Sequence, residues 1–189
     1  MIMNKKDIFT ISNFLSFLRL LLAVPFWILI GKHSLNEINY EVIILCMLAG
    51  LTDVLDGYFA RGRHEITEFG KIIDPLADKI VVATIVIKLF YLNAIPFYYL
   101  AIVIIRDLLI FAGGIFTSKK IGKVLPSNIL GKATVINIGV LILFILFGLK
   151  DIFIYQILYY SSMILMFLSL IGYAIRAREF LSRKTNETF

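Results

Sequence analysis

Cysteine and histidine are nearly absent from this sequence. Its 189 residues include one cysteine, Cys46, and two histidines, His33 and His64. A single cysteine excludes a disulfide framework within the chain and gives no cysteine-based metal site, so Cys46 is expected to be a small packing residue. The histidines stand in polar loops without other metal ligands beside them. The side chains that remain for metal binding are carboxylates.

Polar residues are also scarce. Hydrophobic residues make up 60% of the chain and its mean hydropathy is +0.90, whereas a soluble globular domain is about 45–50% apolar. The net charge of +6 does not indicate nucleic-acid binding, because the basic residues lie in short loops between apolar runs. The composition predicts a membrane protein with the lipid bilayer as its surroundings and no nucleic-acid partner.

Six apolar segments are long enough to cross a bilayer. Each has roughly 17–25 residues, as an α-helix needs to span a hydrocarbon core of about 30 Å. We therefore expect an all-α polytopic protein with one domain over residues 1–189 and six transmembrane helices. The predicted spans cover residues 14–30, 42–59, 70–92, 96–116, 129–149 and 153–175.

The first twelve residues mix apolar and charged side chains. This pattern favours a short helix lying on the membrane surface, and a frayed terminus is the alternative. Lys5 and Lys6 precede an apolar run, as in a signal peptide, but no convincing small-residue cleavage site follows. The first helix is therefore expected to be retained.

Basic residues are distributed unevenly between the two sides of the predicted bundle. With six spans both termini lie on one side, and that side would also hold most of the basic residues, namely Lys5, Lys6, Arg61, Arg63, Lys71, Lys119, Lys120, Lys123, Arg176, Arg178, Arg183 and Lys184. The opposite side would hold only Lys32, Lys88 and Lys150. The positive-inside rule then predicts a multi-pass protein of the cell (inner) membrane with cytoplasmic termini.

Four carboxylates stand at the ends of the second and third spans. Asp53 and Asp56 are three residues apart, and Asp74 and Asp78 are four apart, so each pair lies on one face of its helix. A short loop joins the two helices, and the pairs can therefore converge on one cytoplasmic site. Carboxylates held close together repel one another unless protons or cations intervene, and Mg²⁺ or Mn²⁺ are the natural occupants of such a site.

The same stretch resembles a family signature. The pattern of the CDP-alcohol phosphatidyltransferases is D-x2-D-G-x2-A-R-x8-G-x3-D-x3-D, and every fixed position is met here by Asp53, Asp56, Gly57, Ala60, Arg61, Gly70, Asp74 and Asp78. The resemblance implies a metal-dependent membrane enzyme with two divalent ions per active site. It also implies CDP-diacylglycerol as the phosphatidyl donor and a homodimer as the assembly.

The resemblance further implies roles for single residues. The four aspartates would hold the metal ions, and Asp78 would also be the general base toward the acceptor hydroxyl. The residues implied to bind the CDP donor are Gly57, Ala60, Arg61, Thr67 and Asn13. Because it lacks a Cβ atom, Gly57 lets a nucleotide approach the backbone closely, with helix packing as the alternative. The guanidinium of Arg61 can fork onto phosphate oxygens.

Three basic residues within or beside the spans are candidates for acceptor binding. They are Arg106, Lys132 and Arg19, since an acceptor that carries a phosphate needs about two such cations. Arg106 stands beside Asp107, so a neutralised structural pair is the alternative. Arg19 either faces the bundle interior or snorkels to the membrane surface.

The run from Gly70 to Lys79 narrows the resemblance. Its form, Gly-Lys-x-x-Asp-Pro-x-Ala-Asp-Lys, is similar to that of phosphatidylglycerophosphate synthases, and cardiolipin synthases share it. We therefore expect transfer to glycerol 3-phosphate with release of CMP, and phosphatidylglycerol is the alternative acceptor. A divalent-cation transporter is the hypothesis from another class, but no acidic relay continues toward the other side and the two halves lack broken-helix symmetry.

Overall fold

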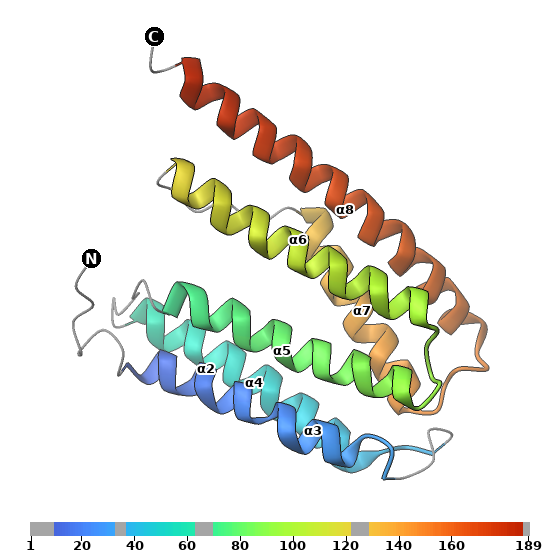
Figure 1. The fold of residues 1–189 in the computed structure, drawn as a ribbon. Coiled ribbons are helices and arrows are strands. Elements are labelled where there is room, and N and C mark those ends of the chain that lie inside the picture. The colour runs from blue at the N-terminus through green and yellow to red at the C-terminus, as the bar shows by residue number, and fades with distance from the viewer. Residues whose placement is uncertain (1–9, 33–36, 63–69, 122–128, 187–189) are drawn as a thin grey trace. The chain divides into compact units, whose positions relative to one another are not determined.

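All regular structure in the described part of the chain is helical. The computed structural model describes residues 10–32, 37–62, 70–121 and 129–186. Its helices are α2 (Ile11–Leu21), α3 (Ala23–Leu29), α4 (Tyr40–Gly62), α5 (Gly70–Tyr91), α6 (Phe97–Ile121), α7 (Ile129–Leu146) and α8 (Phe153–Asn186) (Figure 1). The all-α prediction is confirmed for these ranges, whereas most of the expected surface helix at residues 1–12 lies outside them.

The first predicted span is two helices and not one. Helix α2 ends at Leu21 and α3 begins at Ala23. The break lies just before Pro25, which has no N–H group to donate to the carbonyl of Leu21 four residues earlier. The N–H of Leu22 instead lies 3.2 Å from the Leu18 oxygen and 3.0 Å from the Arg19 oxygen. The proline thus accounts for a kink that the apolar pattern alone does not reveal.

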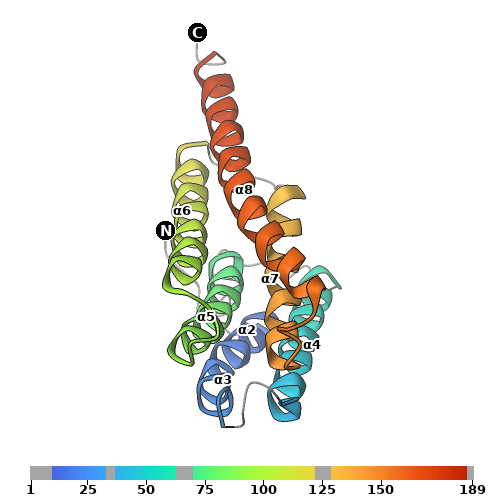
Figure 2. The same ribbon diagram turned by 90° about the vertical axis from the view of Figure 1, so that its right-hand side faces the viewer.

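The other helices begin within two residues of their predicted starts, but α8 ends much later. It has 34 residues, which corresponds to about 51 Å of helix, whereas a hydrocarbon core is about 30 Å thick. The C-terminal part of α8 runs past the end of α6 (Figures 1 and 2). The basic segment that follows the last predicted span is therefore a continuation of the helix.

Three helices in the described ranges are long and apolar enough to cross a membrane. They cover Phe97–Thr117, Ile129–Leu146 and Phe153–Glu179, while Asn13–Leu29 and Tyr40–Thr52 are shorter apolar segments. The apolar part of α4 stops where its two aspartates begin. The chain is thus a membrane protein, and the total of six spans stays a prediction.

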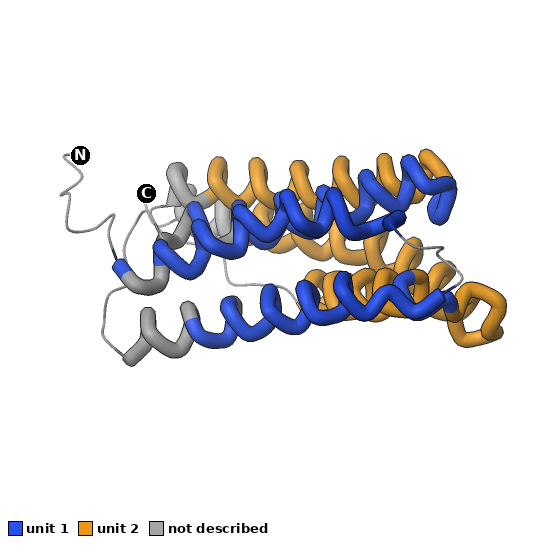
Figure 3. The backbone as a smooth tube through the Cα atoms, turned by 90° about the horizontal axis from the view of Figure 1, so that it is seen from below, with its two compact units in different colours: residues 1–95, 146–148 blue, residues 96–145, 149–189 orange. Residues whose placement is uncertain are grey.

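The chain divides into two compact units (Figure 3). Unit 1 comprises residues 1–95 and 146–148, and unit 2 comprises residues 96–145 and 149–189. In unit 1, α2 packs against both α4 and α5, and α3 also packs against these two helices. In unit 2, α6 packs along α8. The expectation of one domain over the whole chain stays a prediction.

Two polar contacts fix the register of α6 against α8. The hydroxyls of Tyr99 and Ser162 are 2.8 Å apart, and the Nε atom of Arg106 donates to the Ser169 hydroxyl at 3.2 Å. The two partners on each helix are seven residues apart, and all four residues are buried. Because lipid supplies no hydrophobic force between helices, such hydrogen bonds and close packing hold membrane helices together.

The turn after α3 gives a first testable prediction. Gly31 has a φ angle of +89°, and a Cβ atom placed on it would lie 2.8 Å from Cδ1 of Leu92. We expect Gly31→Ala to lower the free energy of unfolding by about 1–3 kcal/mol, mainly because alanine is strained at positive φ. Thermal unfolding in detergent would show a melting temperature lower by several degrees.

The matched control for this substitution is Gly50→Ala in α4 of the same unit. A Cβ atom at Gly50 would meet no atom within 4 Å, and alanine is favoured over glycine inside a helix. The control should therefore melt at the wild-type temperature or slightly above it. Equal melting temperatures for the two variants would contradict the prediction.

Candidate active site

The four aspartates lie on helices at one end of unit 1. Asp53 and Asp56 belong to the last part of α4, and Asp74 and Asp78 to the first part of α5. Residues 63–69 join these two helix ends, which lie at the same end of the unit (Figure 1). Asp53 is about 14 Å from the end of α4 and Asp78 about 12 Å from the start of α5, at 1.5 Å per residue. The two acidic pairs therefore lie at similar distances from the two helix ends that residues 63–69 join.

The structure describes the side chain of only one of these aspartates. Asp78 is half-exposed, with 47% of its side chain accessible, and its Oδ1 atom accepts from Nη1 of Arg19 on α2. The side chains of Asp53, Asp56 and Asp74 lie outside what is described. Among the described residues, no three histidine, cysteine or acidic side chains form a group that could hold a metal ion. Convergence of the four carboxylates thus stays a prediction.

Helix α2 places a polar face inside unit 1. Its N-cap Thr10 accepts a hydrogen bond from the N–H of Asn13 at 3.2 Å. Asn13, Ser16 and Arg19 follow at spacings of three and are all buried. The other side of the helix is apolar and exposed, at Phe14, Phe17, Leu18 and Leu21. A polar interior and an apolar exterior are typical of a helix surrounded by lipid.

The burial of this polar face shows that Arg19 lies inside the unit. Its side chain is 3% exposed, and α2 packs against the two helices that carry the aspartates. Of the two positions considered from the sequence, the interior one is therefore observed, and snorkelling is wrong. Whether Arg19 binds the acceptor is a separate matter, since its guanidinium is already paired with Asp78.

The predicted donor-binding residues are placed only in part. Gly57, Ala60 and Arg61 belong to the last two turns of α4, but their side chains are not among those described, and Thr67 lies outside the described residues. Asn13 is 5% exposed, in the first turn of α2. Asn13 thus faces the interior of the unit that contains the motif.

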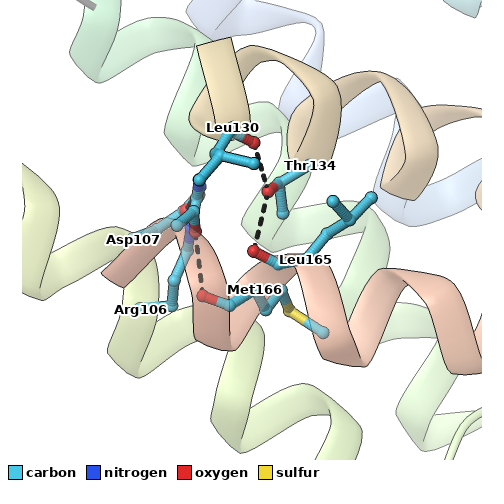
Figure 4. Close-up of polar contacts among 7 residues, drawn as sticks. Arg106, Asp107, Leu130, Thr134, Leu165 and Met166 are labelled. Carbon is cyan, nitrogen blue, oxygen red and sulfur yellow. Dashed lines mark hydrogen bonds and ion pairs between the residues drawn. The ribbon is translucent and has the colours of Figure 1, made fainter. Parts of the chain in front are cut away.

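Arg106 lies in unit 2 in a set of satisfied polar contacts (Figure 4). It is 3% exposed, and its Nη1 atom lies 2.5 Å from Oδ1 of Asp107. Ser169, which accepts from Arg106, itself donates to the Met166 carbonyl at 2.8 Å. The Arg106–Asp107 pair considered from the sequence is observed. Lys132, the other candidate in this unit, is exposed on α7.

A buried threonine ties α7 to α8 beside this pair. The hydroxyl of Thr134 lies 2.7 Å from the carbonyl oxygen of Leu130 on its own helix and 3.1 Å from that of Leu165 on α8 (Figure 4). Gly131 follows Leu130 directly, and a Cβ atom placed on it would lie 3.0 Å from the Tyr173 ring. Helices α7 and α8 thus touch beside Lys132, at Thr134 and Gly131.

The partner of Arg106 on α8 could have been suspected from the sequence. Tyr99 and Arg106 are seven residues apart, and so are Ser162 and Ser169. Two polar pairs with the same spacing in two apolar segments indicate facing stripes. Composition and single motifs do not reveal this signal, because each of these residues by itself is unremarkable.

The residue types of the motif, of which only the Asp78 side chain is described, suit a hard cation. Asp78 is an accessible carboxylate, and the other aspartates of the motif lie at the same end of unit 1. Oxygen donors of this kind suit Mg²⁺ or Mn²⁺. The location at one end of helices in an apolar unit also suits a ligand with a charged head and hydrocarbon tails.

Comparison with known proteins identifies related chains. The family model described as CDP-alcohol phosphatidyltransferase matches residues 9–172, a range that includes the whole aspartate motif. The family is in general metal-dependent. This match favours an enzyme over the divalent-cation transporter.

The individual relatives are named as two different enzymes. The chain is 32% identical over 146 residues to the CDP-diacylglycerol–glycerol-3-phosphate 3-phosphatidyltransferase of Bacillus subtilis (strain 168), covering 74% of this chain and 75% of the relative. The protein of that name from Aquifex aeolicus (strain VF5) is 30% identical over 179 residues, covering 88% and 94%. The cardiolipin synthase (CMP-forming) of Homo sapiens is 36% identical over 104 residues, covering 54% of this chain but 33% of the relative.

Proposed function

The chain belongs to the CDP-alcohol phosphatidyltransferase family and is an enzyme of that class, and on that premise we propose that it acts on CDP-diacylglycerol and glycerol 3-phosphate. The products are phosphatidylglycerophosphate and CMP. One observation carries this choice. The chain is similar, along most of its length and most of theirs, to relatives that are named for this activity. The spacing of the four aspartates supports the enzyme class and does not distinguish between acceptors.

In the proposed reaction the chain supplies a base and a set of phosphate ligands. Asp53, Asp56, Asp74 and Asp78 would hold two divalent ions, Mg²⁺ or Mn²⁺, which when bound neutralise charge on the diphosphate and on the departing CMP. The acceptor hydroxyl oxygen forms a bond to the phosphorus of the phosphatidyl group while the bond from that phosphorus to the CMP oxygen breaks. Asp78 takes the hydroxyl proton, and its exposed carboxylate supports this role.

The donor would be held by residues at the end of α4. Gly57 and Ala60 leave room for the nucleotide, and Arg61 pairs with phosphate oxygens. Thr67 and Asn13 complete the proposed donor set. The acyl chains of the donor stay in the bilayer, which explains why the motif stands at the ends of membrane helices. We propose a homodimer in the cell (inner) membrane, with both termini and this site on the cytoplasmic side.

An acceptor panel tests the proposal directly. The purified protein is given CDP-diacylglycerol with Mg²⁺ or Mn²⁺ and, in separate reactions, glycerol 3-phosphate, phosphatidylglycerol, inositol phosphate or serine. We expect CMP release and a product with the mass of phosphatidylglycerophosphate only with glycerol 3-phosphate. The similarity to the human cardiolipin synthase favours phosphatidylglycerol as the second candidate, and cardiolipin as the product would replace our proposal with that one.

Arg106 and Lys132 are the proposed ligands of the acceptor phosphate. Arg106→Ala should raise the KM for glycerol 3-phosphate about 10–100-fold, because one charge-assisted hydrogen bond contributes about 1.5–3 kcal/mol. The KM for CDP-diacylglycerol should change much less. Steady-state kinetics with each substrate varied in turn measures both constants.

Two serines on α8 give matched controls for this prediction. Ser169→Ala removes the hydroxyl that accepts from Arg106, whereas Ser162→Ala removes the one that contacts Tyr99. The first should raise the acceptor KM modestly, and the second should leave it unchanged. An equal effect of Arg106→Ala on both substrates would argue against an acceptor pocket at this residue.

A further inference from the structure

The ion pair between Arg19 and Asp78 joins a buried side chain to a solvent-accessible one. The arginine side chain is 3% exposed, whereas the aspartate side chain is 47% exposed. Arg106 is as deeply buried, but the carboxylate it contacts, Asp107, is not part of the motif, whereas the carboxylate that Arg19 contacts belongs to Asp78. The exposed partner is the one proposed to react, and the buried partner is the one that can hold it in place.

The position of Arg19 is set by the helix that carries it. Asn13, Ser16 and Arg19 form the buried face of α2, while Phe17 and Leu21 are exposed on the other side. A rotation of α2 that turned Arg19 outward would place its charge in lipid. The same rotation would move Phe17 and Leu21 from lipid into the polar interior of the unit. The guanidinium is thus held by the packing of α2 against α4 and α5, so it is a stable reference point for any side chain bound to it.

The contact restricts the orientation of the Asp78 carboxylate. Oδ1 accepts from Nη1 of Arg19, and a carboxylate with one oxygen anchored has fewer orientations than a free one. Its remaining acceptor capacity then points in a limited set of directions. The guanidinium also competes with a metal ion for the Oδ1 atom of this carboxylate.

We propose that Arg19 is a positioning residue that orients Asp78 toward the acceptor hydroxyl, and that it does not bind the acceptor itself. This inference rests on the proposed function, in which Asp78 is the general base. It replaces the acceptor-binding role that the sequence suggested for Arg19. Small displacements of a reacting group can lower the rate about 10²-fold without changing substrate affinity.

The test compares Arg19→Gln and Arg19→Lys with Arg106→Gln, a second buried arginine that is proposed to bind the acceptor. For each variant kcat, both KM values and the binding of Mn²⁺ are measured, the last by the electron paramagnetic resonance signal of free Mn²⁺. We expect Arg19→Gln to lower kcat about 10²-fold, with both KM values and Mn²⁺ affinity within about threefold of wild type. Arg19→Lys keeps the charge but not the fork and should recover part of kcat, whereas Arg106→Gln should mainly raise the acceptor KM.

Each result distinguishes the inference from the function on which it rests. A raised acceptor KM with near-normal kcat in Arg19→Gln would overturn the positioning role. If Arg19→Gln elutes as an aggregate, Arg19→Lys decides, because a raised acceptor KM with near-normal kcat in that variant would overturn the positioning role. A wild-type protein that releases no CMP with any acceptor contradicts the proposed function, whereas an active wild type with unaffected Arg19 variants contradicts only the inference.

Discussion

Asp78→Asn is expected to lower kcat by about 10²–10⁴-fold, the contribution of a positioned general base. Asparagine has nearly the same size as aspartate and keeps an oxygen that can accept from Arg19, so the contact between α2 and α5 can persist. The amide cannot take the proton of the acceptor hydroxyl. Because the proposed nucleotide ligands are other residues, the affinity for CDP-diacylglycerol should stay close to that of wild type. CMP release and equilibrium binding of the donor in micelles measure the two properties separately.

The control for this variant is the same chemical change far from the motif in sequence. Asp151 is exposed in the turn before α8, and Asp151→Asn should leave kcat within about twofold of wild type, as is usual for surface substitutions. Near-normal turnover in Asp78→Asn would mean that Asp78 is not the base. Loss of donor binding along with turnover would instead assign Asp78 mainly to the metal ions.

Asp56→Ala is expected to abolish activity by a different route, through loss of metal binding. Removing even an outer-shell partner of a metal ligand costs about 10–100-fold in affinity, so loss of a direct ligand should weaken Mn²⁺ binding by at least about 100-fold. The free Mn²⁺ signal during titration measures this affinity without turnover. Treatment of the wild-type protein with EDTA should likewise remove activity, and added Mg²⁺ or Mn²⁺ should restore it.

Glu41 provides a control on the same helix. It lies in the first turn of α4, at the end opposite to Asp56, and its Oε1 is 2.9 Å from Nζ of Lys32. Glu41→Ala removes one carboxylate from α4 without touching the motif, so the Mn²⁺ titration should be unchanged. An unchanged titration in Asp56→Ala as well would exclude Asp56 from the metal site.

The sequence predicts the helices of this protein well where lipid-facing residues dominate. Helices α5, α7 and α8 begin at the predicted residues Gly70, Ile129 and Phe153. For α7 and α8 a change from polar to apolar composition marks entry into the bilayer. Helix α8 continues past residue 175, where the predicted span ends, since hydropathy follows only the part of a helix that lies in lipid. The break before Ala23 was missed because the apolar run continues unchanged across it.

In the candidate site, the features that could be predicted are local in sequence, and those that could not are contacts between residues far apart in the chain. The spacing of the aspartates is local, so the sequence could assign them to helix faces and to a metal. The partners of Arg19 and Arg106 lie 59 and 63 residues away along the chain, on Asp78 and Ser169. Which residues face each other across helices depends on the rotation and register of packed helices, and a single sequence contains this only indirectly.

The paired contacts at Tyr99 and Arg106 have a consequence for motion during turnover. If α8 slid by one turn along α6, both contacts would break together and the Arg106 side chain would lose its hydroxyl partner within the bilayer, where an unpaired polar group costs several kcal/mol. A slide of seven residues restores one contact at most, because it places Ser162 opposite Arg106 or Ser169 opposite Tyr99. We therefore expect the two helices to move together as one rigid body.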